Sequence, residues 1–254
     1  RFWVAHCRTL GIEPHQLSLL LVDEPGSREE DETIIAWSRA IKAAEPDVVI
    51  FDDGTRPPER VLPDTLSAVD IICPHRPALF DAERNVAELV KQQVEAGKRL
   101  YFYSCMGPAR LLDPYAYHRL QAWSAFAHGG EGSFFWALGS SSGDSWNEYV
   151  SADTAYTPLF MSADTVTPGK HMEAIRQSVG DFEYLCMLRD RVAQLAADQP
   201  NHPLLPQARA LLAEAPQRVL GAPGATGLKW EDEKDSTIAD GICVEIVKML
   251  ERLK

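Results

Sequence analysis

Two adjacent carboxylic acids follow an apolar run near the start of the sequence. Asp23 and Glu24 come directly after residues 17–22, which have the continuous apolar character of a strand buried on both faces. In parallel α/β folds, ligands bind at the carboxyl ends of the strands. Repulsion between neighbouring charges favours a proton on one acid, as a general acid requires. The pair therefore predicts acid–base chemistry, with a helix cap or a salt bridge as the alternative.

Polar residues also follow the next two apolar runs. Asp52 comes after residues 47–51 and is the better candidate there for contacting a ligand hydroxyl, whereas Asp53-Gly54 is typical of a turn. His75 follows residues 69–73 and could either contact ligand or form a structural hydrogen bond. No spacing indicates a Ser-His-Asp triad.

Aromatic residues at or after strand ends point to a sugar as the ligand. Aromatic rings can stack on the apolar faces of sugars, while polar groups bind the hydroxyls. Each ring alone could equally belong to the core, but the set lies near a polar Gly/Ser loop at residues 139–143 and indicates a carbohydrate cleft. Its members are Tyr103, Trp136, Trp146 and Tyr149.

These candidates are positioned by alternating strands and helices. Ser27 and Glu30 have the spacing of a helix-starting capping box, and the helix they begin carries an apolar stripe at Ile34, Trp37, Ile41 and Ala44. The alternation predicts a parallel sheet, followed by an irregular segment and further helices. The predicted strands are 17–22, 47–51, 69–73, 100–103 and 132–138. The predicted helices are 27–45, 81–96, 113–128, 170–199, 203–215 and 235–253, and residues 139–169 are predicted to be irregular.

Composition argues against several classes of function. A net charge of -12 repels phosphate backbones, so nucleic acid is not expected as a partner. No apolar run reaches the roughly 20 residues that a membrane-spanning helix needs. The five cysteines lack metal-binding spacing and no G-x-G-x-x-G follows a strand, so we expect no metal and no cofactor. The sequence begins with Arg1, so we expect a fragment or processed product whose missing signal peptide is uninformative.

Several motifs together resemble glycoside hydrolase family 123. LVDEP (21–25), YFYSC (101–105), YHR with AW (117–123), GSFFW (132–136) and a late block follow one another in the family's order. The late block, with MEAIR (172–176) and GDFEYL (180–185), is the most specific, and the resemblance covers about residues 15–190.

The resemblance implies a (β/α)₈ barrel of the TIM type, of which this chain holds about the last five β/α units. We expect residues 1–199 to form that carboxyl-terminal part of the barrel and residues 200–254 a helical extension. The absent first three strands would leave residues 17–22 as an apolar edge. A preceding segment or a second chain would then complete the barrel, unless the fold is rearranged.

The resemblance also implies an exo-acting, retaining β-N-acetylgalactosaminidase or hexosaminidase in which the 2-acetamido group of the substrate is the nucleophile. Glu24 would be the general acid and Asp23 would orient the acetamido group. Tyr103 would donate to the acetamido oxygen, and Trp136 would form the floor under the sugar. The strand end at residues 103–106 carries no acid, which agrees with a nucleophile supplied by the substrate. No role for His75 follows, and the family suggests a periplasmic or secreted protein.

Two other functions remain open from the sequence. A barrel glycosidase could act on a sugar without a 2-acetamido group, with Glu24 as acid and Asp52 or another carboxylate as base or nucleophile. A non-catalytic carbohydrate-binding or structural module would keep the aromatic residues without hydrolysis. Arg176, Asp181 and Glu183 are predicted to form a polar network between helix and barrel rather than to catalyse.

Overall fold

The computed structural model describes residues 1–254 except 55–59, 82–85, 108 and 140–156. The chain divides into two compact units. The sheet unit comprises Arg1–Ser104 and His128–Phe134, and the helical unit comprises Cys105–Ala127 and Phe135–Lys254. This division differs from the expected boundary after residue 199.

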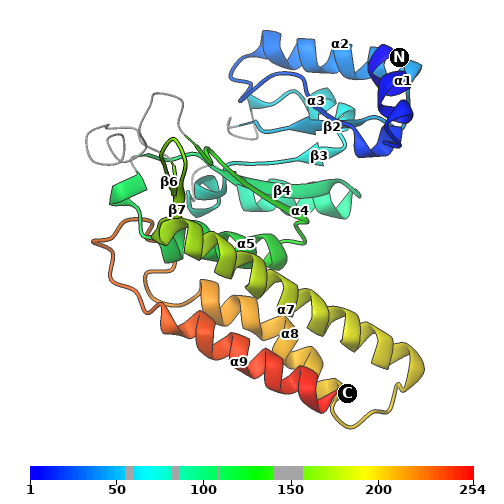
Figure 1. The fold of residues 1–254 in the computed structure, drawn as a ribbon. Helices are drawn as coiled ribbons and strands as arrows, with labels where there is room; N and C mark the ends of the chain where they lie inside the picture. Colours follow the sequence, from blue (N-terminus) through cyan, green and yellow to red (C-terminus); the bar gives the residue numbers. More distant parts are fainter. Residues whose placement is uncertain (55–59, 82–85, 108, 140–156) are drawn as a thin grey trace. The chain divides into compact units, whose positions relative to one another are not determined.

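The sheet unit is built on five strands in the spatial order of the sequence (Figure 1). The first three neighbouring pairs are parallel, with Ser18 opposite Val49, Phe51 opposite Ile71 and Ile72 opposite Leu100. The sheet curls as half of a barrel wall would, which confirms the α/β class and is consistent with a partial barrel, while a full barrel is not seen in the described residues. The strands are β1 (Ser18–Leu20), β2 (Val49–Asp52), β3 (Ile71–Ile72), β4 (Arg99–Ser104) and β5 (Gly132–Phe135).

Burial explains why the central strands form and leaves β1 as an edge. Ile50, Leu100 and Phe102 have no exposed surface, as expected for strands covered on both faces. β1 stands at the end of the strand order, and its Leu20 is 42% exposed. The predicted apolar edge is therefore confirmed for the part of the chain that the structure describes.

Helix α2 of the sheet unit begins where the local sequence signal predicts, whereas α1 and α3 were not predicted. Ser27 Oγ accepts the Glu30 backbone N–H, and the Glu30 carboxylate accepts the Ser27 N–H, so the capping box is confirmed. Trp37 corrects the predicted apolar stripe because it is 59% exposed. The buried face runs through Asp31, Ile34, Ile35 and Ser38, and Trp37 lies on its flank. The α-helices are α1 (Phe2–Thr9), α2 (Arg28–Ala44), α3 (Pro63–Ala68) and α4 (Val86–Glu95).

The helical unit has a continuous apolar core. Leu120, Trp123, Leu185 and Ile246 are fully buried in it, although they are far apart in the sequence. A π-helix (Tyr115–Arg119) leads into the helix α5 (Leu120–Ala127). The other helices are α7 (Lys170–Asp198), α8 (Leu205–Leu220) and α9 (Thr237–Arg252).

An antiparallel hairpin corrects the prediction that residues 139–169 are irregular throughout. β6 (Leu159–Met161) pairs with β7 (Val166–Pro168), with Phe160 opposite Thr167. The Ser162 N–H donates to the Thr165 carbonyl at 2.9 Å and closes the turn between them.

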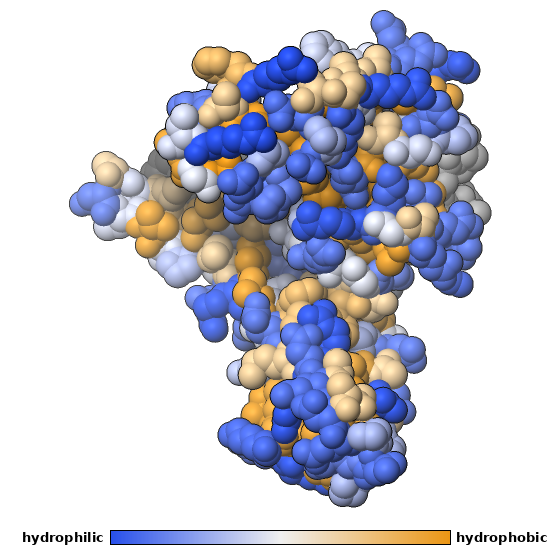
Figure 2. Space-filling view, turned by 90° about the vertical axis from the view of Figure 1, so that its right-hand side faces the viewer, coloured by the Kyte–Doolittle hydropathy of each residue, from blue (hydrophilic) through white to orange (hydrophobic). Residues whose placement is uncertain are grey.

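The surface mixes apolar and charged side chains (Figure 2). Phe2 and Trp3 on α1 are 78% and 68% exposed, and Trp37 on α2 is also exposed. Among the described residues, no helix combines the length and the apolar character that crossing a membrane requires.

Candidate functional site

The parallel register brings four acidic residues to one edge of the sheet unit. Leu20 of β1 lies opposite Phe51 of β2, so these two strands end side by side. Asp23 and Glu24 follow the end of β1, and Asp52 and Asp53 lie at the end of β2. Asp52 and Asp53 are 7% and 8% exposed, whereas Asp23 and Glu24 are exposed. The structure therefore places these four acids at neighbouring strand ends, and their roles stay predictions.

Asp53 holds the backbone of Glu24. Its Oδ1 accepts the Glu24 backbone N–H at 3.0 Å. Glu24 has φ +45°, in the left-handed region, which costs a residue with a Cβ about 1–2 kcal/mol. Such a conformation persists only where the surroundings enforce it, and it occurs most often at functional sites.

Tyr103 holds the side chain of Glu24. The Tyr103 hydroxyl donates to Glu24 Oε1 at 2.6 Å from a position near the end of β4. Tyr103 is only 8% exposed, and its ring lies 5.0 Å from the ring of His75. Glu24 is therefore an exposed acid whose backbone and carboxylate are both held by buried residues.

The acidic cluster changes the proton affinity of its buried members. The pKa of Asp53 is raised to about 6, mainly by burial; the hydrogen bond from Glu24 acts against this rise, and the charges of Asp23 and Asp52 add to it. Burial, together with the charges of Asp53 and Asp52, also raises the pKa of the Cys73 thiol. A thiol held in its protonated form is a poor nucleophile, so the cluster suits proton transfer better than thiolate chemistry.

Asp52 is the last residue of β2 and directly precedes the turn at Asp53-Gly54. A Cβ added to Gly54 would stand 3.2 Å from Asp52 Oδ2 and 3.8 Å from Cγ of Pro25. Gly54 thus gives the Asp52 carboxylate room close to the backbone. The proposed contact between Asp52 and a sugar hydroxyl stays a prediction.

The predicted aromatic residues fall in different parts of the chain. Tyr103 and His75 belong to the sheet unit, next to Glu24. Trp136 belongs to the helical unit and is 63% exposed. Trp146 and Tyr149 lie outside the described residues.

Asp53 is the residue whose part in the site the sequence did not predict. Asp-Gly is typical of a turn, and the contact of Asp53 is with a backbone N–H 29 residues earlier. The one available signal was the repetition of an acidic pair at two neighbouring strand ends.

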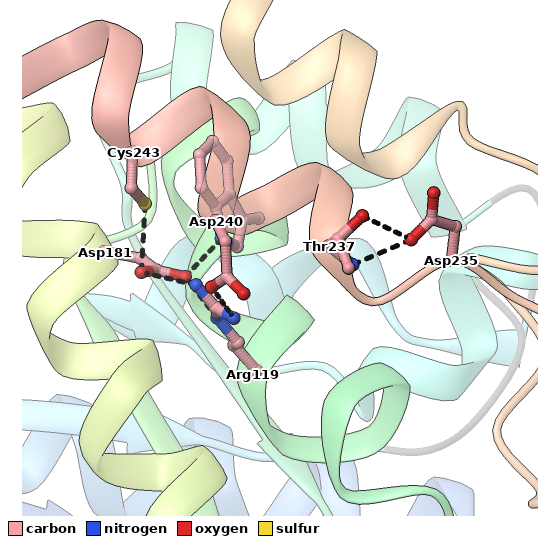
Figure 3. A network of polar contacts seen from close by, with 7 residues as sticks. Arg119, Asp181, Asp235, Thr237, Asp240 and Cys243 are labelled. Atoms are coloured by element: carbon pink, nitrogen blue, oxygen red, sulfur yellow. Dashed lines mark hydrogen bonds and ion pairs between the residues drawn. The ribbon is translucent and has the colours of Figure 1, made fainter.

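A separate polar network lies inside the helical unit (Figure 3). Arg119 donates twice to Asp181, with Nε 2.7 Å from Oδ2, and once to Asp240 at 2.6 Å. Trp123 Nε1 and Cys243 Sγ also donate to Asp181, at 2.8 and 3.1 Å. Arg119 and Asp181 have only 6% of their side chains exposed, so this network joins helices of one core.

The three late residues predicted to form a polar network behave differently. Asp181 is a buried partner of Arg119. Arg176 pairs with Glu173 on the surface of the same helix, and Glu183 is exposed.

The described residues contain no group of three or more His, Cys, Asp or Glu side chains arranged to hold a metal ion.

Comparisons with known proteins give a likeness of fold. No protein-family profile matches the sequence, and no curated protein matches it. The chain is similar to the structure of a family 123 glycoside hydrolase from Clostridium perfringens, which was described in connection with glycolipid glycan hydrolysis. The TM-score is 0.57 at 12% sequence identity. The match covers 99% of this chain, which spans 44% of the length of that structure.

Proposed function

We propose that this chain is the carboxyl-terminal part of a glycoside hydrolase barrel, with Glu24 as the proton donor. The observation that supports this most strongly is the double restraint on Glu24. Asp53 binds its backbone N–H and Tyr103 binds its carboxylate, at the carboxyl edge of a parallel, curled sheet. The likeness of fold to a family 123 glycoside hydrolase supports the class of reaction.

The position of Glu24 suits general acid catalysis. A positioned acid or base contributes about 10²–10⁴-fold to a rate, provided that it lies within hydrogen-bond reach of the reacting oxygen. Glu24 is exposed to ligand, yet its carboxylate is fixed from one side by Tyr103. An acid with a defined direction and an open face can approach the oxygen of a leaving group.

Asp23 complements this acid in a substrate-assisted mechanism. The 2-acetamido oxygen of the sugar attacks the anomeric carbon while Glu24 gives its proton to the leaving oxygen, and an oxazolinium ion forms. The neighbouring Asp23 orients the acetamido group and stabilises its developing positive charge. Water then opens the oxazolinium ion, and Glu24 takes the proton from that water.

Tyr103 couples substrate binding to the state of Glu24. A tyrosine hydroxyl has one proton to donate, and here it is donated to Glu24. When a sugar binds, the same hydroxyl can turn to the incoming acetamido oxygen, and the Glu24 carboxyl is then free to face the oxygen of the leaving group.

Other residues complete the proposed sugar site. Within the sheet unit, we assign contacts with sugar hydroxyls to Asp52 and His75. The open edge at β1 supports a further proposal, that a preceding segment or a second chain adds strands there and completes the barrel.

The comparison of two substrates tests the proposed reaction. We expect the chain, together with the segment or second chain that completes its barrel, to hydrolyse an aryl β-N-acetylhexosaminide, and to be inhibited by a thiazoline that mimics the oxazoline. The matched glycoside without the 2-acetamido group should not be cleaved. Equal rates on both would favour a glycosidase with an enzyme nucleophile, and no hydrolysis of any aryl glycoside would favour a binding or structural module.

A further inference from the structure

The left-handed backbone of Glu24 requires something to hold it. We propose that Asp53 is a positioning residue that sets the direction of the Glu24 carboxyl by binding the Glu24 backbone N–H. This inference rests on the proposed role of Glu24 as proton donor. Asp53 acts through Glu24 and has no contact with the reacting atoms.

The geometry supports this role because the hydrogen bond is made at the strained torsion itself. The Glu24 N–H lies in the peptide plane that φ rotates, so its 3.0 Å bond to Asp53 Oδ1 restrains φ near +45°. Once φ is fixed, the Cα–Cβ bond of Glu24 has a fixed direction. Tyr103 then needs to fix only the remaining side-chain torsions.

Asp53 is itself held firmly enough to act as a reference point. It follows β2, whose last residue Asp52 pairs with Ile72 of the neighbouring strand, and the Cys73 N–H donates to the Asp52 carbonyl at 2.7 Å. The loop after Asp53 also passes close to the loop of Glu24, since the Cβ position of Gly54 is 3.8 Å from Pro25 Cγ. The two strand ends are thus joined directly at the acid.

The chemical cost of Asp53 argues against a purely structural role. It is a carboxyl that is 8% exposed, with Asp52 directly before it and the charge of Asp23 acting on it. A buried acid among like charges destabilises the fold unless it is well paired, and an apolar residue in that place would pack without this cost. Residues that lower stability in this way are typical of functional sites.

Two substitutions at Asp53 test whether its acceptor oxygen holds the Glu24 backbone. Asp53→Asn keeps an oxygen that can accept the Glu24 N–H, whereas Asp53→Leu keeps the branching at Cγ and removes the acceptor. Asp47→Asn, at an exposed position before β2, is the matched control. For each full chain, we would measure kcat and KM on aryl β-N-acetylhexosaminides whose leaving groups differ in acidity, and solve the crystal structure.

We expect Asp53→Leu to lower kcat by about tenfold to a hundredfold on poor leaving groups. The loss should be much smaller on activated leaving groups, with KM nearly unchanged, because the misplaced group is an acid. Asp53→Asn should restore most of the rate. In the crystal structures, φ of Glu24 should stay positive in the Asn variant and become negative in the Leu variant.

The outcome is separable from that of the proposed function. If φ of Glu24 stays positive in Asp53→Leu, or if the loss is equal for all leaving groups and Asn does not restore it, Asp53 does not position the acid. If the wild-type chain cleaves no aryl glycoside, the proposed function fails. The values of φ at Glu24 in the crystal structures of the Asn and Leu variants still show whether Asp53 holds Glu24. Thermal unfolding of each variant identifies any loss that is only a failure to fold.

Discussion

The conformation of Glu24 is a feature of a single residue with a measurable cost. A glycine populates the left-handed region without the penalty that a Cβ imposes. We therefore expect Glu24→Gly to be more stable than Glu24→Ala by about 1 kcal/mol, although both lack the carboxylate. Denaturant unfolding of the two variants measures the difference. Equal stability, or a more stable Ala variant, would show that φ +45° is not the conformation of residue 24 in solution.

Asp53 should make stability depend on pH. Its pKa is about 6 in the folded chain against the ordinary 3.8, so the folded state binds the proton more tightly than the unfolded state. The stabilising contribution of this proton is complete below pH 4 and is lost as pH rises through 6. The total change is on the order of 3 kcal/mol.

The matched variant for this effect is Asp53→Asn, which cannot titrate. As pH rises from 4 to 7, the unfolding free energy of the wild type should fall relative to that of Asp53→Asn. Chemical denaturation at a series of pH values measures it. A difference that stays constant, or shifts in favour of the wild type, would contradict the raised pKa.

At this scale the sequence predicted part of the site. Asp23, Glu24 and Tyr103 were proposed because they lie at or directly after predicted strand ends, which are at the edge of the sheet. The bond from Tyr103 to Glu24 joins residues 79 positions apart, and that from Asp53 to Glu24 joins residues 29 apart. Neither contact follows from local spacing, because each depends on how the strands pack.

Among the elements, the helices depend on the buried pair of Arg119 and Asp181. Loss of one partner leaves an unpaired charge in the core, which typically costs about 3–5 kcal/mol. We expect Asp181→Ala to destabilise the chain by that amount, and Arg119→Met with Asp181→Leu to destabilise it less than either single change. Thermal unfolding would show the order of stabilities.

The control for this prediction is an ion pair on the surface of the same helix. Glu173 and Arg176 have half or more of their side chains exposed, and Glu173→Ala should change stability by less than about 0.5 kcal/mol. If Asp181→Ala had an effect as small as the control, the network in Figure 3 would not stabilise the helices.

Elements with a local signal were predicted well, and those without one were missed. The capping box at Ser27 and Glu30 fixed the start of α2, and apolar runs located all five strands of the sheet. The hairpin β6–β7 was missed because its strands have only three residues each, one of them Pro168, and show no alternation of buried and exposed residues. Its turn, closed by Ser162 and Thr165, determines its register instead.

For the molecule as a whole, we expect the open edge of β1 to influence association in solution. An apolar strand edge pairs with other chains, and a charged side chain on it prevents such pairing. Leu20 is 42% exposed on this strand, so we expect Leu20→Lys to reduce self-association at high concentration. Light scattering measures this, with Leu111→Lys in the helical unit, where Leu111 is 51% exposed, as control. Equal scattering by wild type and Leu20→Lys would mean that β1 is not the associating edge.

The division into units is where the sequence was least informative. A change from strand–helix alternation to helices alone suggested a boundary after residue 199. In the structure, α7 belongs to the unit of α8 and α9, because Leu185 and Leu188 are buried in the same core as Ile246. The pattern of apolar residues shows that a helix has a buried face, but not which partner covers that face.

The most direct test of the account is the activity of Glu24→Gln on substrates with different leaving groups. An amide cannot donate the proton, so the variant should lose most of its rate on poor leaving groups and much less on an activated aryl β-N-acetylhexosaminide. Asp23→Asn should lose activity on both. Small and equal losses in the two variants would contradict the account, because the chemistry would then lie elsewhere in the molecule.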